Sequence, residues 1–214
     1  MLNLSLKELF EKAKLPVNLD NEKEKKFLIY LRELKKWNEK INLTSLKDET
    51  EIIEKLFIDS LFFLKFLRIK ATSQHLDIGS GAGFPAIPIK IIFPHINLTL
   101  LEVRKKKASF LKHVIRFLSL KNTKVIDRRF EEIHKCGYIV ENFDLITIRG
   151  IGITKKIITI SYNLLNQGGI FIYFGGKRDF ENSYLNKTPF AGFDLKTYQL
   201  PFSKLNRTLL VFKK

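Results

Sequence analysis

The stretch HLDIGSGAGFPAIPIKI (75–91) sets three glycines and two prolines inside otherwise apolar sequence. An apolar run that ends in Gly79, Gly81 and Gly83 predicts a strand followed by a tight turn, because glycine reaches backbone conformations that other residues avoid. The two prolines suit the first turn of a helix, where backbone amides have no partner within the helix. The stretch therefore predicts a strand, a glycine-rich turn and a helix in direct succession.

Two classes of cofactor bind at turns of this kind: dinucleotides and S-adenosylmethionine. The dinucleotide fingerprint requires the spacing Gly-x-Gly-x-x-Gly, whereas this chain has Gly-x-Gly-x-Gly after a strand that ends with an acid, Asp77. An acidic side chain can hold the ammonium group of S-adenosylmethionine, either directly or through water. We therefore expect S-adenosylmethionine at Asp77, Gly79, Gly81 and Gly83, with a nucleotide-dependent oxidoreductase as the alternative.

A second acidic residue follows at the end of the next apolar run. LTLLEV (98–103) ends its strand at Glu102, where a carboxylate can accept hydrogen bonds from both hydroxyl groups of a ribose. A third run, RRFEEI (128–133), contains Phe130 and Glu131, which we expect to supply an apolar wall and an amide beside the adenine. The order of strand, glycine turn, helix and strand ending in glutamate predicts a cofactor site more strongly than any one of these signals.

Short apolar runs alternate with helical patterns from residue 74 onward. Such alternation predicts an α/β fold with a mostly parallel sheet and helices on both faces, which binds ligands at the carboxyl ends of its strands. The expected strands cover 74–79, 97–103, 123–130, 143–150, 168–175 and 207–214, and the expected helices cover 84–93, 105–120 and 153–165.

Residues 1–70 have the pattern of helices alone. Apolar residues recur at helical spacing in 5–15, 21–41 and 50–67, and Ser5 begins a capping-box pattern. We expect an N-terminal helical extension over 1–70 and a Rossmann-like domain over 71–214. Trp37 falls on one apolar stripe, so we expect it to pack in the core rather than against an RNA base.

The composition is that of an ordinary globular protein, with 214 residues of which 45% are hydrophobic. The longest apolar runs are far shorter than the roughly 20 residues of a membrane helix, and charged residues interrupt the N-terminal segment where a signal peptide is apolar. We therefore expect a cytoplasmic protein with no membrane association. The single cysteine excludes an internal disulfide, and the four histidines lack ligand spacing, so we expect no metal. Nothing in the sequence suggests more than a monomer.

The net charge of +16 lies mostly in the second part of the chain. Residues 1–70 contain 15 Lys or Arg and 12 Asp or Glu, whereas residues 71–214 contain 23 and 10. A positive field of this strength favours a polyanionic partner, nucleic acid before an anionic membrane surface. General lysine enrichment without an anionic partner is the alternative.

Four consecutive cations open the helix expected over 105–120. Positive charge is unfavourable at a helix N-terminus, so phosphate binding explains the run, and a solvated lysine-rich face is the alternative. The cations are Arg104, Lys105, Lys106 and Lys107.

Seven blocks of sequence together match the pattern of one known family. They are WNEKINLTS (37–45), DSL (59–61), LDIGSGAGFPAIPIKI (76–91), LLEVRKKKASFLKHV (100–114), RRFEEI (128–133), FDLITIRG (143–150) and NRTLLVFKK (206–214). From about residue 30 to its end, the chain resembles the bacterial small-subunit rRNA guanine-N7 methyltransferases, once called glucose-inhibited division protein B. The first block is typical of this family rather than of methyltransferases in general.

The resemblance implies a class I methyltransferase fold with a seven-stranded, mostly parallel sheet and an N-terminal helical extension. It implies transfer of a methyl group from S-adenosylmethionine to N7 of a guanine in the decoding-region loop (helix 18) of 16S rRNA. The family's cofactor contacts fall on Gly79, Phe84, Phe130, Glu131 and Arg149. Two further residues are expected to contact RNA, namely Arg207 at a basic position near the carboxyl end and Asn42 in the first block, although Asn42 and Thr44 are equally suited to cap a helix.

Three positions depart from the family pattern. Leu56 stands where histidine is usual, Gly175 stands where many members have lysine, and IRG (148–150) replaces Ser-Arg-Ala. We expect these departures to concern the RNA contacts more than the cofactor pocket. A non-catalytic or retargeted RNA-binding protein of the same fold is therefore the main alternative, whereas the basic charge disfavours a methyltransferase for small molecules or proteins.

Methylation of guanine N7 requires no general base, because this nitrogen carries a free lone pair. Catalysis then consists mostly of aligning N7, the methyl carbon and the sulfur, and orientation can lower a barrier by about 7 to 11 kcal/mol in favourable model reactions. We accordingly expect no catalytic triad. Arg149, at a strand end, is the catalytic candidate and is expected to contact the cofactor carboxylate or the target nucleotide, with a surface ion pair as the alternative.

Overall fold

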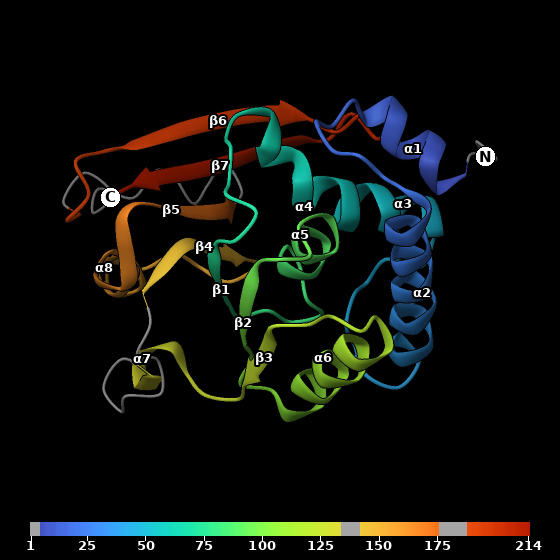
Figure 1. Cartoon of the computed structure of the whole chain (residues 1–214), viewed down its shortest axis with the longest axis horizontal. Helices are drawn as coiled ribbons and strands as arrows, with labels where there is room; N and C mark the ends of the chain where they lie inside the picture. The colour runs from blue at the N-terminus through green and yellow to red at the C-terminus, as the bar shows by residue number, and fades with distance from the viewer. Residues whose placement is uncertain (1–4, 134–141, 176–187) are drawn as a thin grey trace.

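A seven-stranded sheet runs through the middle of the computed structural model, which describes residues 5–133, 142–175 and 188–214. The strand order is β3-β2-β1-β4-β5-β7-β6 (Figure 1). The strands are β1 (Gln74–Ile78), β2 (Asn97–Leu101), β3 (Thr123–Ile126), β4 (Phe143–Arg149), β5 (Leu165–Gly175), β6 (Phe193–Gln199) and β7 (Asn206–Lys213).

Among these strands only β7 runs against its neighbours. The five strands from β3 to β5 pair in parallel, with β1 at the centre, where Leu76 lies opposite Thr99 of β2 and Ile146 of β4. β7 pairs antiparallel with both β5 and β6. The chain winds outward from β1 first in one direction and then in the other, and folds of this kind bind ligands at that switch point, between β1 and β4.

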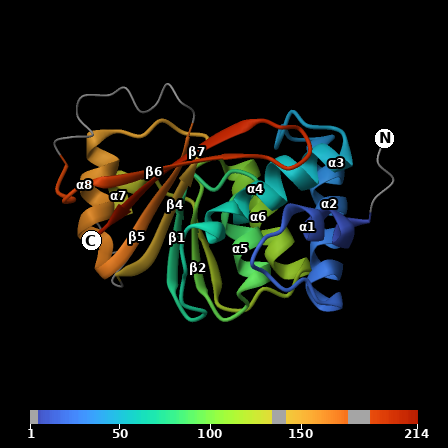
Figure 2. The same cartoon turned by 90° about the horizontal axis from the view of Figure 1, so that it is seen from above.

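Helices cover both faces of the sheet (Figure 2). α5 (Ala86–Ile92) and α6 (Lys105–Phe117) lie on one face, whereas α7 (Phe130–Ile133) and α8 (Lys155–Leu164) lie on the other. Right-handed crossovers that step in opposite directions along the sheet put their helices on opposite faces. The mostly parallel seven-stranded sheet implied by the resemblance is confirmed.

The N-terminal helices pack beside and outside α5 and α6 (Figure 2). They are α1 (Leu6–Ala13), α2 (Asn21–Asn38), α3 (Glu49–Ile52), the π-helix η1 (Ile53–Ile58), α4 (Asp59–Leu61) and the 3-10 helix η2 (Phe62–Lys65). α2 contacts both α5 and α6, and α4 contacts α5. Phe27 of α2 and Phe57 of η1 belong to the same apolar cluster as Ile87 of α5. The helical segment and the sheet therefore share one core, and a domain boundary at residue 70 stays a prediction.

Polar side chains explain where three of these helices begin. Ser5 and Glu8 form the predicted capping box, in which the Ser5 amide donates to the Glu8 carboxylate at 2.7 Å. Asp20 caps α2 and Asp48 caps α3 by accepting hydrogen bonds from amides of the first turn. Such caps satisfy backbone donors that the helix itself leaves free.

Two sequence predictions are wrong in detail. The strand expected over 123–130 ends at Ile126, and Phe130 begins α7 instead. The helix expected over 50–67 is interrupted by η1, a π-helix with a wider turn than an α-helix. β6 was not assigned from the sequence. Among the described residues no helix is both long and apolar enough to cross a membrane.

Candidate functional site

The glycine-rich turn after β1 is held to the end of β2. Gly79, Gly81 and Gly83 have φ angles of +69°, +57° and +97°, in the left-handed region that favours glycine. The Gly81 amide donates a hydrogen bond to Oε2 of Glu102 at 2.7 Å. The turn therefore lies at the carboxyl ends of β1 and β2, where the sequence predicts the cofactor.

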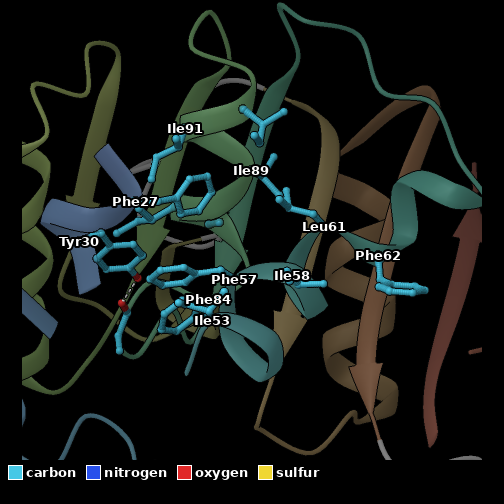
Figure 3. Packing of buried hydrophobic residues seen from close by; sticks show 14 of the residues in the cluster. Phe27, Tyr30, Ile53, Phe57, Ile58, Leu61, Phe62, Phe84, Ile89 and Ile91 are labelled. Atoms are coloured by element: carbon cyan, nitrogen blue, oxygen red, sulfur yellow. Dashed lines mark hydrogen bonds between the residues drawn. The ribbon is translucent and has the colours of Figure 1, made fainter. Parts of the chain in front are cut away.

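Tyr30 of α2 fixes the turn from another side. Its hydroxyl donates to the Ala82 carbonyl at 2.5 Å, and its ring stacks on Phe57 and on Phe84 with centroids 5.3 Å apart in each pair (Figure 3). A Cβ at Gly83 would lie 2.8 Å from the Tyr30 hydroxyl oxygen, so this close approach requires glycine. Burial raises the pKa of Tyr30 well above its ordinary value, and the hydroxyl therefore stays a donor. The N-terminal helices thus help to shape the turn.

A cleft of about 480 Å³ opens along the carboxyl ends of β1, β2 and β4, a size in the usual range for small-molecule sites. Apolar side chains such as Ile151 and Ile157 line it together with polar and charged groups. It brings together many of the predicted site residues, namely Gly79, Gly81, Phe84, Glu102, Arg104, Lys107, Phe130 and Arg149. Exposed glycine backbone, a carboxylate, an apolar wall and cations therefore meet in one place.

Glu102 is the acidic group of this cleft. It is 6% exposed, and its two carboxylate oxygens accept hydrogen bonds from the amides of Gly81 and Arg104 at 2.7 and 2.8 Å. These two bonds fix the carboxylate at the wall of the cleft. Each oxygen keeps a further lone pair, so the carboxylate can still accept hydrogen bonds from a ligand.

Two predicted cofactor residues, Gly83 and Asp77, are not part of the cleft lining. Gly83 faces Tyr30. Asp77 is fully buried, with Thr147 Oγ1 donating to its Oδ1 at 2.6 Å, and its Oδ2 has no partner within the part of the chain that the structure describes. Glu131 belongs to α7, but its side chain lies outside the described residues.

Burial controls the protonation of Asp77 and of its neighbour His75. The loss of water raises the pKa of Asp77 to about 7, despite the hydrogen bond from Thr147. Burial lowers the pKa of His75 to about 3, so its ring is neutral, and Nε2 lies 2.8 Å from Thr147 Oγ1. Because the Thr147 hydroxyl donates to Asp77, His75 Nε2 carries the proton and donates to Thr147.

Replacing Asp77 with asparagine is expected to change how stability depends on pH. The carboxyl group keeps its proton up to about pH 7 when folded but only up to about pH 4 when unfolded. Ionisation of Asp77 therefore lowers the free energy of unfolding of the wild type as pH rises from about 4 to 7. Asp77→Asn lacks that fall, so its urea midpoint rises relative to the wild type over this range.

Comparing the two proteins isolates the carboxyl group. His75 changes stability in the opposite direction, since its lowered pKa removes stability as pH falls below about 6.5, but it is common to both proteins. A difference between the two urea midpoints that stays constant from acid to neutral pH would contradict a protonated, buried Asp77.

A second cavity of about 430 Å³ adjoins the cleft. Arg149, Gly150 and Ile151 line both cavities. The remaining lining comes from α4, β5, β6, β7 and the segment after β4, through Asp59, Gly152, Tyr173, Phe174, Gly175, Tyr198, Arg207 and Thr208. Arg149 therefore lies between the two cavities. Its ion-pair partner, Asp59, is buried, so the pair is not the surface ion pair considered as the alternative.

Asp59 holds Arg149 in place, and sequence reasoning did not assign it a function. Its Oδ2 accepts hydrogen bonds from Arg149 Nη2 at 2.9 Å and from Arg207 Nε at 3.1 Å. Its Oδ1 accepts from the Tyr198 hydroxyl at 2.6 Å, and only 2% of the residue is exposed. The three partners of Asp59 lie far away in the sequence, so no local pattern indicated its role. The only sequence feature that marked Asp59 was the DSL block (59–61).

The departures from the family pattern lie around the two cavities. Leu56 lines the cleft, Gly175 lines the second cavity and Gly150 lines both, whereas Ile148 is buried within β4. The altered side chains are therefore next to the cleft in which the cofactor is expected, as well as next to the expected RNA contacts.

The basic run at the start of α6 surrounds a shallow hollow of about 370 Å³, called the basic hollow below. Its lining residues are Lys40, Ile41, Asn42, Arg104, Lys105, Lys106 and Lys107. Within the described ranges the four cations at 104–107 form no ion pair. Arg207 is not part of this hollow and lies at the second cavity.

The loop before α3 places Asn42 in the basic hollow rather than at a helix end. Asp48 caps α3, and the Asn38 side chain holds the loop by accepting from the amides of Leu43 and Thr44 at 2.8 and 2.9 Å. Across residues 5–133, 142–175 and 188–214, no group of three or more His, Cys, Asp or Glu side chains is placed to hold a metal ion. Cys136 lies outside these ranges.

Solved methyltransferase structures share this fold. A putative O-methyltransferase from Klebsiella pneumoniae matches with a TM-score of 0.64 over 86% of this chain and 89% of its own, at 13% identity. A 16S rRNA N2 methyltransferase from Thermus thermophilus, solved with S-adenosylmethionine and guanosine, matches with a TM-score of 0.56 over 72% of this chain and 42% of its own, at 17% identity. The fold, with its glycine-turn cleft at the strand ends, is that of the class I S-adenosylmethionine-dependent methyltransferases.

The sequence places the chain within one family of that class. Residues 23–211 match the model of the family described as rRNA small subunit methyltransferase G. A ribosomal RNA small subunit methyltransferase G from Caldanaerobacter subterraneus is 39% identical over 186 residues, which cover 85% of this chain and 77% of its own. One from Dictyoglomus thermophilum is 42% identical over 160 residues, which cover 75% and 67%. The chain belongs to the rRNA small subunit methyltransferase G family, which confirms the resemblance seen in the sequence.

Proposed function

We propose that this chain transfers a methyl group from S-adenosylmethionine to N7 of a guanine in the helix 18 loop of 16S rRNA. Membership of the family supports small-subunit rRNA as the substrate. The observation that carries the proposal is the common wall of the cleft and the second cavity, formed by Arg149, Gly150 and Ile151. Methyl transfer requires a donor site and an acceptor site that meet, and this wall is where the two sites meet.

The residues of the cleft fit S-adenosylmethionine. Glu102 presents a fixed carboxylate to the ribose hydroxyls, Phe130 and Ile151 give apolar surface to the adenine, and Gly79 brings its backbone to the cleft. The buried Oδ2 of Asp77 has no partner among the described residues, and once the carboxyl group has lost its proton this oxygen can accept a hydrogen bond from a water that bridges to an ammonium group. These groups together match the ribose, base and amino-acid parts of the cofactor.

When bound, the cofactor supplies an electrophilic methyl group on a sulfonium. The chain itself binds and orients the two reactants, because guanine N7 has no proton to lose. Asp59 has no role as a base in such a transfer, and its buried carboxylate accepts hydrogen bonds from Arg149, Arg207 and Tyr198. Its contribution is to hold Arg149 at the wall between the cavities, and the half-buried ring of Tyr198 offers surface for the target base.

Transfer of label to ribosomal subunits tests this function. We expect purified chain with methyl-labelled S-adenosylmethionine to label 16S rRNA in small subunits from a strain that lacks the modification, and to leave large subunits unlabelled. Binding of both cofactor and RNA without label would instead favour a non-catalytic or retargeted RNA-binding protein.

Replacing Lys105 and Lys106 with glutamine is expected to weaken RNA binding and to flatten its salt dependence. Both lysines line the basic hollow, and neither lines the cofactor cleft. Each lost phosphate contact lowers the slope of log K against log salt by about 0.7 to 0.9, so the slope falls by about 1.4 to 1.8. Affinity for S-adenosylmethionine stays unchanged.

The matched control removes two exposed lysines of α1, as Lys7→Gln/Lys12→Gln. It changes the net charge equally and leaves the basic hollow intact, so its slope stays close to that of the wild type. An unchanged slope in the Lys105→Gln/Lys106→Gln variant would mean that the run is only a solvated face.

A further inference from the structure

A groove of about 500 Å³ lies between the last turns of α2 and the exposed face of α6, outside both cavities of the proposed active site. α6 contributes positions three and four residues apart, which share one face of a helix. The loop that follows α2 closes the groove. The lining residues are Lys36, Trp37, Lys40, Ile41, Lys106, Ser109 and His113.

Aromatic rings form the wall of this groove. Trp37 is half-buried and packs on Phe110 with ring centroids 5.6 Å apart, and its ring lies 5.0 Å from that of His113. His113 is held by the buried Glu33, whose Oε2 lies 2.9 Å from His113 Nε2. The row continues to Phe117, which is 46% exposed and 4.4 Å from His113. Trp37 therefore packs partly in the core, as predicted, and also faces the groove.

The lysines of the groove are available to a ligand. Lys36, Lys40 and Lys106 are exposed and form no ion pair within the described part of the chain. By contrast, the neighbouring Lys35 pairs with Glu49 at 2.5 Å. Three unpaired cations around an aromatic wall attract an anion that also carries a flat apolar ring.

The groove is continuous with the active site. It shares Lys40, Ile41 and Lys106 with the basic hollow, and the hollow shares Arg104 and Lys107 with the cofactor cleft. An RNA strand that crosses the rim of the cleft at Arg104 and Lys107 therefore meets further cations at the basic hollow and at the groove beside Trp37.

We propose that this groove binds an unpaired nucleotide of the RNA substrate other than the methylated guanine, with its base against Trp37 and His113 and its phosphates at Lys36, Lys40 and Lys106. Aromatic side chains that stack on bases, set among backbone-binding cations, are the common means of holding single-stranded RNA. The inference rests on the proposed function for the identity of the RNA, but not for the binding of a nucleotide at this place.

Trp37 reports directly on the groove because it is the only tryptophan in the chain. We expect a short single-stranded oligoribonucleotide to quench Trp37 emission, with the same midpoint as binding followed by the anisotropy of a labelled oligonucleotide. Heparin, a polyanion without bases, is expected to bind without comparable quenching. Oligonucleotide binding that leaves Trp37 emission unchanged would overturn the proposal.

Variants test whether the groove acts in catalysis on the ribosomal subunit. Lys36→Gln/Lys40→Gln is expected to raise the KM for small subunits and to weaken the quenching, whereas Lys7→Gln/Lys12→Gln changes neither. Trp37→Leu is expected to raise the KM at least about fivefold through the loss of one stacked base. Trp37→Phe keeps a flat ring, so its KM is expected to stay closer to the wild-type value. The kcat stays near the wild-type value, because none of these residues lines the cofactor cleft.

The outcomes separate this proposal from the proposed function. Normal methylation by Lys36→Gln/Lys40→Gln with unchanged KM and quenching would overturn the groove assignment alone. Absence of methyl transfer in the wild type would overturn the function, while the quenching experiment, which needs no turnover, still decides the groove. A raised KM for subunits without any quenching by RNA would mean that the groove contacts a ribosomal protein, which also overturns the proposal.

Discussion

Replacing Gly81 with valine is expected to abolish methyl transfer and to leave the chain folded. A Cβ at Gly81 would meet only the carbonyl oxygen of Gly79, at 3.8 Å, so the fold has room for it. Gly81 lines the cleft, however, and a branched side chain there occupies space that the cofactor requires. We expect affinity for S-adenosylmethionine, measured by calorimetry, to fall at least about tenfold, with no detectable labelling of rRNA.

The left-handed backbone of Gly81 requires a matched control. Its φ of +57° adds strain of about 1 to 2 kcal/mol to any side chain. Gly168 has a φ of +77°, is exposed and has nothing within 4 Å of an added Cβ, so Gly168→Val carries the same kind of strain far from the cleft. We expect Gly168→Val to methylate normally. Wild-type activity in Gly81→Val, or equal loss in both variants, would contradict the assignment of the cleft.

Replacing Arg149 with methionine is expected to lower kcat/KM for methyl transfer at least about 100-fold, the usual effect of losing one charged group that stabilises a reaction site. Arg149 is the only cation that lines both cavities among the described residues. Methionine keeps an apolar stem of similar length, and Asp59 keeps Arg207 and Tyr198 as donors. The free energy of unfolding therefore falls by only about 1 to 3 kcal/mol, which urea denaturation measures.

Arg207 provides the control for the ion pair itself. It also donates to Asp59, but it lines only the second cavity. Arg207→Met is therefore expected to raise the KM for RNA and to leave cofactor affinity unchanged, whereas Arg149→Met also weakens cofactor binding. Identical effects of the two variants on both ligands would mean that Arg149 serves only to neutralise Asp59.

The glycine-rich turn could be predicted because its signals are local. Glycine spacing, the preceding apolar run and the acid at the end of the next strand each follow from the needs of a few adjacent residues. The structure places Gly79, Gly81 and Glu102 together in one cleft. Alternation of apolar runs and helical patterns likewise predicted the parallel part of the sheet, because each buried strand has its own continuous apolar sequence.

The strand β6 could not be predicted because it lies at the edge of the sheet. Its sequence, FDLKTYQ (193–199), is mostly exposed or half-buried and has no continuous apolar run. Pairing with β7 gives it its strand structure, and that partner follows later in the chain. A pattern of continuous apolar runs therefore does not indicate this strand or a role for its Tyr198.

The π-helix η1 and the contacts of Asp59 depend on tertiary structure. A helical pattern over 50–67 predicts regular turns, whereas the wider turn at Ile53–Ile58 immediately precedes the buried Asp59 and Ser60. Arg149, Tyr198 and Arg207 meet Asp59 only when β4, β6 and β7 are assembled. No local spacing in the sequence indicates that these side chains come together. For the same reason, the sequence predicted Asp77 as an acid near the cofactor but not its complete burial.

The methylated atom is the most direct test of the central claim. Purified chain is incubated with tritiated S-adenosylmethionine and small subunits from a strain that lacks the methylation, and the rRNA is then treated with reduction and aniline, which cleave at N7-methylguanosine. We predict a single labelled guanine, in the helix 18 loop, with cleavage at that same nucleotide. Label at a base that resists this cleavage, label outside that loop, or no label while the cofactor binds would contradict the assigned function.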